Sequence, residues 1–271
     1  MTGPDAYDRV LAKWPQPVGS QDLATSFGTT RVHACGPAGA DPVLLLHSGG
    51  ATSTVWYATV PALLPAHRVY APDRIGDTGR SVPNGRPVRR VEDLMDWLDE
   101  VVTGLGLDRV ALVGHSYGAW LALRYALHAP GRVSRLALLD PTDCFAGLSL
   151  RYRLRAIPLL LRPSPARVRS FLAWETGGVA LDPDWLEVTA QGANPRPLPR
   201  PPAVARLREL TTPTLVLLAE RSRAHDIRRV QEGVRRAMPD ARIVVLEGAT
   251  HSTIPAYHHE HLNRELAAFL G

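Results

Sequence analysis

The stretch "LVGHSYGAW" at residues 112–120 places a serine between two glycines, after an apolar run and before a run with helical periodicity. A serine at a sharp strand-to-helix turn is held in a strained backbone conformation, so only small residues fit two positions before and after it. Gly114 and Gly118 occupy those two positions. We therefore interpret Ser116 as a candidate nucleophile, with its hydroxyl lifted above a strand end and a helix N-terminus directed at it.

Outward from this turn, short apolar runs alternate with longer helical patterns. This alternation is typical of βαβ units and predicts an α/β fold with a mostly parallel sheet. The expected strands are 42–47, 68–73, 109–115, 135–140, 212–220 and 241–248, with an early hairpin within 26–36. The expected helices are 5–14, 91–104, 117–130, 227–238 and 258–270.

Residues 141–211 interrupt the alternation. They hold helical pieces such as "LRYRLRAIPLLL" (150–161) and the proline-rich "NPRPLPRPP" (194–202), for which extended, semi-rigid backbone is expected. A segment this long between two strands of one sheet is most simply an inserted helical cap over the strand ends, where substrate enters. The expected division is an α/β core of 1–140 and 212–271 and a helical cap of 141–211.

The composition is that of a soluble, globular chain. Its 271 residues are 45% hydrophobic and 21% charged, and no apolar run approaches the length needed to cross a bilayer. The N-terminus lacks the basic and apolar regions of a signal peptide, so we expect a cytoplasmic protein with no membrane span. Cys35 and Cys144 match no zinc or redox spacing. A reduced cytoplasm is the natural setting for such cysteines. We expect neither a metal nor a cofactor.

The formal net charge is +5, and nearly all of the positive charge is arginine, since Lys13 is the only lysine. Short clusters occur at 86–90 and 151–155, while the other arginines are scattered. A polyanionic partner is one interpretation of this charge. Because no nucleic-acid recognition motif accompanies it, we expect a small-molecule substrate and no nucleic acid. The sequence does not indicate an oligomeric state.

A serine hydroxyl needs a base to take its proton, and that base is expected late in the chain. "LEGATHST" (246–253) supplies His251, just past the last expected strand and before the closing helix. His258, His259 and His261 lie within the helical pattern, where we expect solvated side chains. His251 is therefore the candidate base.

A carboxylate must orient the imidazole and stabilise its cation. After the penultimate strand the chain reads "LLAERSRAHD", with Ser222 at the turn where an acid is expected. Glu220 comes slightly early, and Asp226 comes late, where it would cap a helix. Asp140 ends the preceding strand, and we assign it as the acid. Asp226, Glu220 and Asp143 stay open as alternatives.

Two backbone amides are expected to stabilise a developing oxyanion. The amide of Tyr117, at the helix N-terminus, is the first candidate. The second should come from the loop "HSGG" after the first central strand, where small residues let backbone approach a substrate oxygen. We assign the amide of Gly49, with Ser48 and Gly50 as alternatives, and we expect His47 to hold the loop by hydrogen bonds.

The segments "HSGG", "PDRIGDTGRS", "GHSYG" and "GATH" occur in the order and spacing of the α/β-hydrolase superfamily. With "DAYDRVLAKWP" and "STVWY", the chain resembles bacterial carboxylesterase-like serine hydrolases along almost its whole length. The resemblance implies an α/β-hydrolase fold, an eight-stranded, mostly parallel sheet with a helical cap inserted after strand 6. It also implies Ser116 as the nucleophile and His251 as the base.

These residues predict acyl transfer to water, in which Ser116 attacks an ester or thioester carbonyl and forms an acyl-enzyme. Two other classes stay open: a non-hydrolytic enzyme on the same fold (a lyase, cyclase or transferase), and a small-molecule-binding pseudo-enzyme. Within the expected cap, five apolar residues would form either a pocket roof or ordinary helix packing; they are Leu159, Leu160, Leu161, Phe171 and Trp174.

Overall fold

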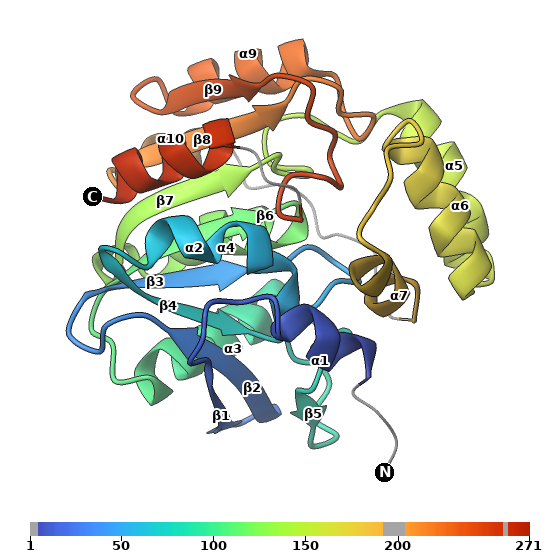
Figure 1. Cartoon of the computed structure of the whole chain (residues 1–271). Helices are drawn as coiled ribbons and strands as arrows, with labels where there is room; N and C mark the ends of the chain where they lie inside the picture. The colour runs from blue at the N-terminus through green and yellow to red at the C-terminus, as the bar shows by residue number, and fades with distance from the viewer. Residues whose placement is uncertain (1–4, 192–203, 257–259) are drawn as a thin grey trace.

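A central sheet of nine strands organises the computed structural model, which describes residues 5–191, 204–256 and 260–271 (Figure 1). Its order is β1-β2-β4-β3-β6-β7-β8-β9, with β5 paired to β2. The strands are β1 (Gly19–Thr25), β2 (Gly28–Cys35), β3 (Asp41–Leu46), β4 (His67–Pro72), β5 (Val82–Pro83), β6 (Val110–His115), β7 (Val133–Leu139), β8 (Thr214–Ala219) and β9 (Arg242–Leu246). The strands β4, β3, β6, β7, β8 and β9 run parallel to one another, whereas β1, β2 and β5 pair antiparallel.

Helices cover both faces of the sheet, which explains why β6 and β8 are apolar and buried at almost every position. One core contains residues of α1 (Ala6–Leu11), the 3₁₀ helix η1 (Ser53–Ala58), α2 (Val60–Leu63) and α10 (Glu260–Leu270). The other contains residues of α3 (Val91–Gly104), α4 (Tyr117–His128), α8 (Val204–Arg208) and α9 (Ile227–Ala237). A short 3₁₀ turn, η2 (Pro130–Arg132), leads into β7.

The segment between β7 and β8 begins with α5 (Leu150–Leu161), α6 (Pro165–Glu175) and α7 (Pro183–Gln191). In Figure 1, α5 and α6 lie side by side at the right-hand edge, outside the layers of the sheet. Ion pairs fasten α7 to α1, because Arg9 lies 2.7 Å from both Asp184 and Glu187. The proline-rich stretch 194–202 lies outside the described residues.

The predicted α/β fold with a mostly parallel sheet is confirmed, with two differences in detail. The two-residue β5 adds a ninth strand, so the inserted helices follow β7 in the numbering of the structure. The structure has an early hairpin, formed by β1 and β2, but the expected range 26–36 is wrong in extent. That range holds only the turn and the second strand, β2, and the hairpin begins at Gly19. The first strand, β1, is a mostly exposed edge strand, so it carries no apolar signal.

Among the helices, α3 spans the expected 91–104, and α4 ends two residues before the expected 130. The last helix is described from Glu260, and positions 258 and 259 of the predicted range lie outside the described residues. Of the helices that the structure describes, none has the length and apolar character needed to cross a bilayer.

Candidate active site

Ser116 occupies a strained turn between β6 and α4, with φ 56° and ψ −113°. Such a φ is costly for a residue with a side chain, and it directs the hydroxyl away from the sheet. The flanking glycines make the turn possible. A Cβ at Gly114 would overlap the carbonyl oxygen of Gly118, and a Cβ at Gly118 would overlap that of Leu46. The strand-to-helix turn expected from the sequence is therefore present.

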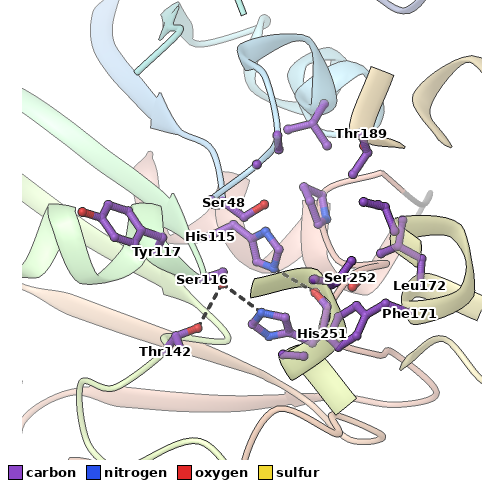
Figure 2. Close-up of a pocket in the computed structure, with 18 of the residues that line it drawn as sticks. Ser48, His115, Ser116, Tyr117, Thr142, Phe171, Leu172, Thr189, His251 and Ser252 are labelled. Carbon is purple, nitrogen blue, oxygen red and sulfur yellow. Dashed lines mark hydrogen bonds between the residues drawn. The ribbon is translucent and has the colours of Figure 1, made fainter. Parts of the chain in front are cut away.

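Three predicted side chains form one chain of hydrogen bonds. The Oγ of Ser116 lies 2.9 Å from Nε2 of His251, and Nδ1 of His251 lies 2.6 Å from Oδ2 of Asp140. Because an ionised carboxylate only accepts, Nδ1 carries the proton and Nε2 is left to accept from the serine. Figure 2 shows Ser116 between His251 and Thr142, whose Oγ1 also lies 2.9 Å from the serine Oγ.

Asp140 is fully buried and receives hydrogen bonds from several groups besides His251. Ser222 donates its hydroxyl to Oδ2 at 2.8 Å, while the amide of Ala219 and Nε2 of His225 donate to Oδ1 at 3.1 and 3.0 Å. Burial raises the pKa of this carboxyl, but His225 and His251 outweigh it and hold the pKa well below its usual range. Asp140 is therefore an ionised, fixed acceptor for the imidazole.

The three alternative carboxylates lie elsewhere. Asp226 caps the first turn of α9, as its position before that helix suggested. Glu220 accepts the amide of Gly248 at 2.8 Å, and Asp143 accepts the amide of Leu148 at 3.3 Å. Ser222, which holds the turn position typical of an acid, instead donates to the acid supplied by the neighbouring strand end.

Glu175, the last residue of α6, is a buried carboxylate that sequence reasoning did not single out. Its Oε1 accepts the backbone N–H of His251 at 3.0 Å. Its Oε2 accepts the N–H of Ser252 at 3.0 Å and the hydroxyl of Thr250 at 3.2 Å. One side chain of the inserted segment therefore holds the loop that carries the imidazole.

The carboxylates around His251 decide its protonation. Burial lowers the pKa of the imidazole, but hydrogen bonding to Asp140 and the charges of Asp140 and Glu175 outweigh burial and raise the pKa above its ordinary value. The imidazolium that forms when His251 takes a proton is thus stabilised by two negative charges. Such stabilisation is what a general base in a low-dielectric site requires.

Two further histidines hold the backbone around the site in place through hydrogen bonds. His47 donates from Nδ1 to the carbonyl of Ser48 at 2.7 Å and accepts the amide of Arg74 at Nε2, so it has the loop-holding position expected for it. His115 donates from Nε2 to the carbonyl of His251 at 2.8 Å, and burial lowers its pKa to about 3. Both imidazoles are therefore neutral structural groups at neutral pH.

A cavity of about 280 Å³ opens at Ser116 and is lined by Ser48, Gly49 and Tyr117, which carry the candidate oxyanion amides. Gly50 also lines it, but its N–H points to the carboxylate of Asp77 at 3.2 Å. The Gly50 amide is therefore engaged, which leaves Gly49 and Ser48 as candidates on that loop.

The rest of the cavity wall is mainly apolar and comes from the inserted helices. Its larger members from α5, α6 and α7 are Tyr152, Leu159, Val168, Phe171, Leu172 and Trp185. Among the five residues proposed for a pocket roof, Leu159, Leu160 and Phe171 line the cavity. Leu161 instead faces solvent with 75% of its surface exposed, and Trp174 lines a separate groove beside α5. Of the two open interpretations, the pocket roof therefore applies to the first three residues and not to these last two.

A model of the alpha/beta hydrolase family matches residues 43–269. Because this match spans well over half of the chain, the protein belongs to the alpha/beta hydrolase family. Within that family the chain is a carboxylesterase-like hydrolase, as the resemblance in its motifs predicted.

Its relatives include carboxylesterases of Bacillus subtilis. The uncharacterized carboxylesterase nap is 30% identical over 257 residues, which cover 90% of this chain and 84% of the relative. Carboxylesterase YbfK is 36% identical over 140 residues, covering 52% of this chain and 47% of the relative. The crystal structure of naproxen esterase (carboxylesterase NP) superposes with a TM-score of 0.90 at 28% identity, covering 98% of this chain and 96% of the other. These similarities support ester hydrolysis as the class of reaction.

Proposed function

We propose that this protein hydrolyses a carboxylic ester or thioester of a small molecule through an acyl-enzyme on Ser116. The single observation that carries the proposal is the chain of hydrogen bonds from Ser116 through His251 to Asp140 at the wall of an apolar cavity. Similarity to carboxylesterases supports the same reaction. Serine as the nucleophile also argues against the aspartate-based epoxide and haloalkane chemistry of this fold.

In this mechanism the Oγ of Ser116 attacks the substrate carbonyl carbon while Nε2 of His251 takes the hydroxyl proton. The C=O becomes a tetrahedral oxyanion, stabilised by the amides of Gly49 and Tyr117; one such donor contributes about 3 kcal/mol. His251 then returns the proton to the leaving alcohol or thiol. Water attacks the acyl-enzyme by the same steps, and Asp140 stabilises the imidazolium each time.

We propose residues 141–211 as the cap of the active site and residues 1–140 with 212–271 as its core. In support, α5, α6 and α7 supply most of the apolar cavity wall, and Glu175 ties α6 to the loop of His251. The wall bears aromatic and branched aliphatic groups, which favour substrates with an uncharged, apolar acyl or alcohol group.

The proposal is tested with 4-nitrophenyl esters of increasing acyl length and with one acyl thioester, comparing wild type with Ser116→Ala. The expected result is turnover by the wild type with an initial burst of nitrophenol, and loss of both in the variant. The matched control is Ser252→Ala, which removes another cavity hydroxyl that is not bonded to His251 Nε2. Equal turnover by wild type and Ser116→Ala would refute the acyl-enzyme mechanism.

A further inference from the structure

Helix α5 exposes an apolar face to solvent. Among its residues none is buried, although its inner side, with Tyr152 and Leu159, lines the active-site cavity. On the outer side of α5, four apolar residues follow one another at intervals of four, three and four positions, so they lie in a row along the helix. Their exposed fractions are 71% for Leu150, 57% for Leu154, 41% for Ile157 and 75% for Leu161. We refer to these four residues as the leucine stripe. Single exposed apolar residues are common, but a continuous row along one helix marks a contact surface.

The leucine stripe lies in a strongly cationic part of the chain. Residues 144–174 contain no Asp or Glu and six arginines, namely Arg151, Arg153, Arg155, Arg162, Arg167 and Arg169. Within the described part of the chain, none of these six is ion-paired with a carboxylate. Elsewhere on the surface, arginines such as Arg9 and Arg132 do have acidic partners. Within the described residues, the positive charge around α5 is therefore not compensated by ion pairs with carboxylates.

A shallow groove beside α5 combines exposed apolar side chains with positive charge. It is lined by Leu150, Arg151, Leu154, Arg155 and Trp174. The guanidinium of Arg151 lies 5.7 Å from the ring centroid of Trp174. Tryptophan and arginine next to exposed leucines are the groups that occupy the boundary between lipid headgroups and acyl chains.

We infer that α5 binds the surface of an anionic lipid bilayer, with the leucine stripe inserted among the acyl chains and the arginines at the phosphate level. The partner must supply both apolar contact and negative charge, and an anionic membrane supplies both. A second copy of this chain would bring unpaired arginines against unpaired arginines. A nucleic acid would satisfy the charge but would leave four exposed aliphatic side chains in water.

This orientation places the active-site cavity next to the membrane. Leu160 lines the cavity and is also 54% exposed, so the cavity wall and the outer face of α5 meet at this residue. If Ser116 acts as proposed above, an amphiphilic ester held in the bilayer would reach it over a short path. The binding itself does not depend on catalysis, so an inactive Ser116→Ala protein is expected to bind equally well.

The inference is tested by co-sedimentation of the full chain with vesicles of phosphatidylcholine alone and with vesicles that also contain phosphatidylglycerol. Wild type and Ser116→Ala are expected to sediment with the anionic vesicles only, and to be released by high salt. Leu154→Ser/Leu161→Ser is expected to lower the partition coefficient by about tenfold or more, and Arg153→Glu/Arg155→Glu by a similar factor. All four substituted side chains are exposed, so the variants should keep the circular dichroism of the wild type.

The matched controls change the same residue types at other sites. Val82→Ser removes an aliphatic group that is 63% exposed on β5, and Arg235→Glu/Arg236→Glu reverses two exposed charges on α9. Both controls are expected to bind like the wild type. The inference is overturned by a wild type that stays in solution with anionic vesicles, or by controls that weaken binding as much as the stripe variants. It is also overturned if the wild type self-associates through the stripe, or binds DNA or RNA, without binding vesicles.

Discussion

Glu175 Oε1 accepts the backbone N–H of His251 at 3.0 Å, so a buried carboxylate of the inserted segment fixes the loop of the candidate base. Its other oxygen binds the next amide, that of Ser252, at 3.0 Å. The position of the imidazole therefore depends on how α6 packs onto the core. The same carboxylate also acts through its charge, since it helps to raise the pKa of His251.

Glu175→Gln should affect both roles. The glutamine amide replaces one carboxylate oxygen with an NH₂ group, which faces a backbone N–H that the oxygen accepted in the wild type. Leaving one buried donor without an acceptor costs about 1–3 kcal/mol of stability. Loss of the negative charge should lower the pKa of His251, which must be neutral to act as a base. The acid limb of kcat/KM against pH is therefore expected to move to lower pH, while kcat falls.

Esterase activity measured across pH, together with urea unfolding, checks this prediction for Glu175→Gln. Glu209→Gln, an exposed change beyond α8, is the control and should leave both profiles unchanged. A purely structural role for Glu175 would lower stability without moving the acid limb. An unchanged limb would therefore contradict the electrostatic part of the account.

Asp140→Asn should lower kcat by about 10⁴-fold, because an amide no longer holds His251 in the required tautomer or stabilises its cation. Asp226→Asn is a matched control, since Asn caps a helix about as well as Asp and α9 should keep its first turn. The measurement is kcat for a 4-nitrophenyl ester. Activity that survives Asp140→Asn but disappears in Asp226→Asn would reverse the assignment of the acid.

His225 should act as a positioning residue for Asp140. Burial raises the pKa of that carboxyl, and His225 is the largest of the groups that lower it. His225→Ala should therefore reduce kcat and raise the pKa of Asp140, so that protonation of Asp140 adds to the loss of activity at the acid end of the pH profile. His225→Gln, whose amide can still donate, should restore much of the wild-type profile. Identical profiles of activity against pH for the wild type and His225→Ala would show that His225 does not act as a positioning residue for Asp140.

His115 should make the fold sensitive to acid. Burial lowers its folded pKa from 6.5 to about 3, so the folded state keeps it neutral while the unfolded state takes up a proton. Its contribution to stability is complete above about pH 6.5 and declines as pH falls toward the folded pKa, by up to about 1.4 kcal/mol per pH unit. Urea unfolding at several pH values should give a shallower decline for His115→Gln. If the free energy of unfolding fell equally steeply with pH in the wild type and in His115→Gln, the predicted role of His115 in acid sensitivity would be contradicted.

Local patterns were enough to single out the three residues that the structure joins by hydrogen bonds. Ser116 lies in a turn that only small flanking residues permit, and His251 lies in a loop at a strand end, so both carry local signals. The place of Asp140 at a strand end indicates the acid, and Ser222 holds the position that an acid often takes. These residues lie together because parallel strands end at the same edge of a sheet, where their end residues meet.

Other features depended on contacts between distant segments. Glu175 ends an ordinary helix 76 residues before His251, and nothing in its neighbourhood indicates which loop it reaches. His225 was one residue from a helix cap, and its approach to Asp140 across 85 residues follows from how β7 and β8 pair. The sequence does not reveal strand β1, because an edge strand exposed to water needs no apolar pattern.

The most direct test of the central claim is covalent labelling of the wild type with a fluorophosphonate, followed by intact-mass and peptide mass spectrometry. The account predicts one adduct per chain, located on Ser116, with no adduct in Ser116→Ala and much slower labelling in His251→Ala. A wild type that takes up no label, or a label that persists at another residue in Ser116→Ala, would contradict a serine nucleophile activated by His251.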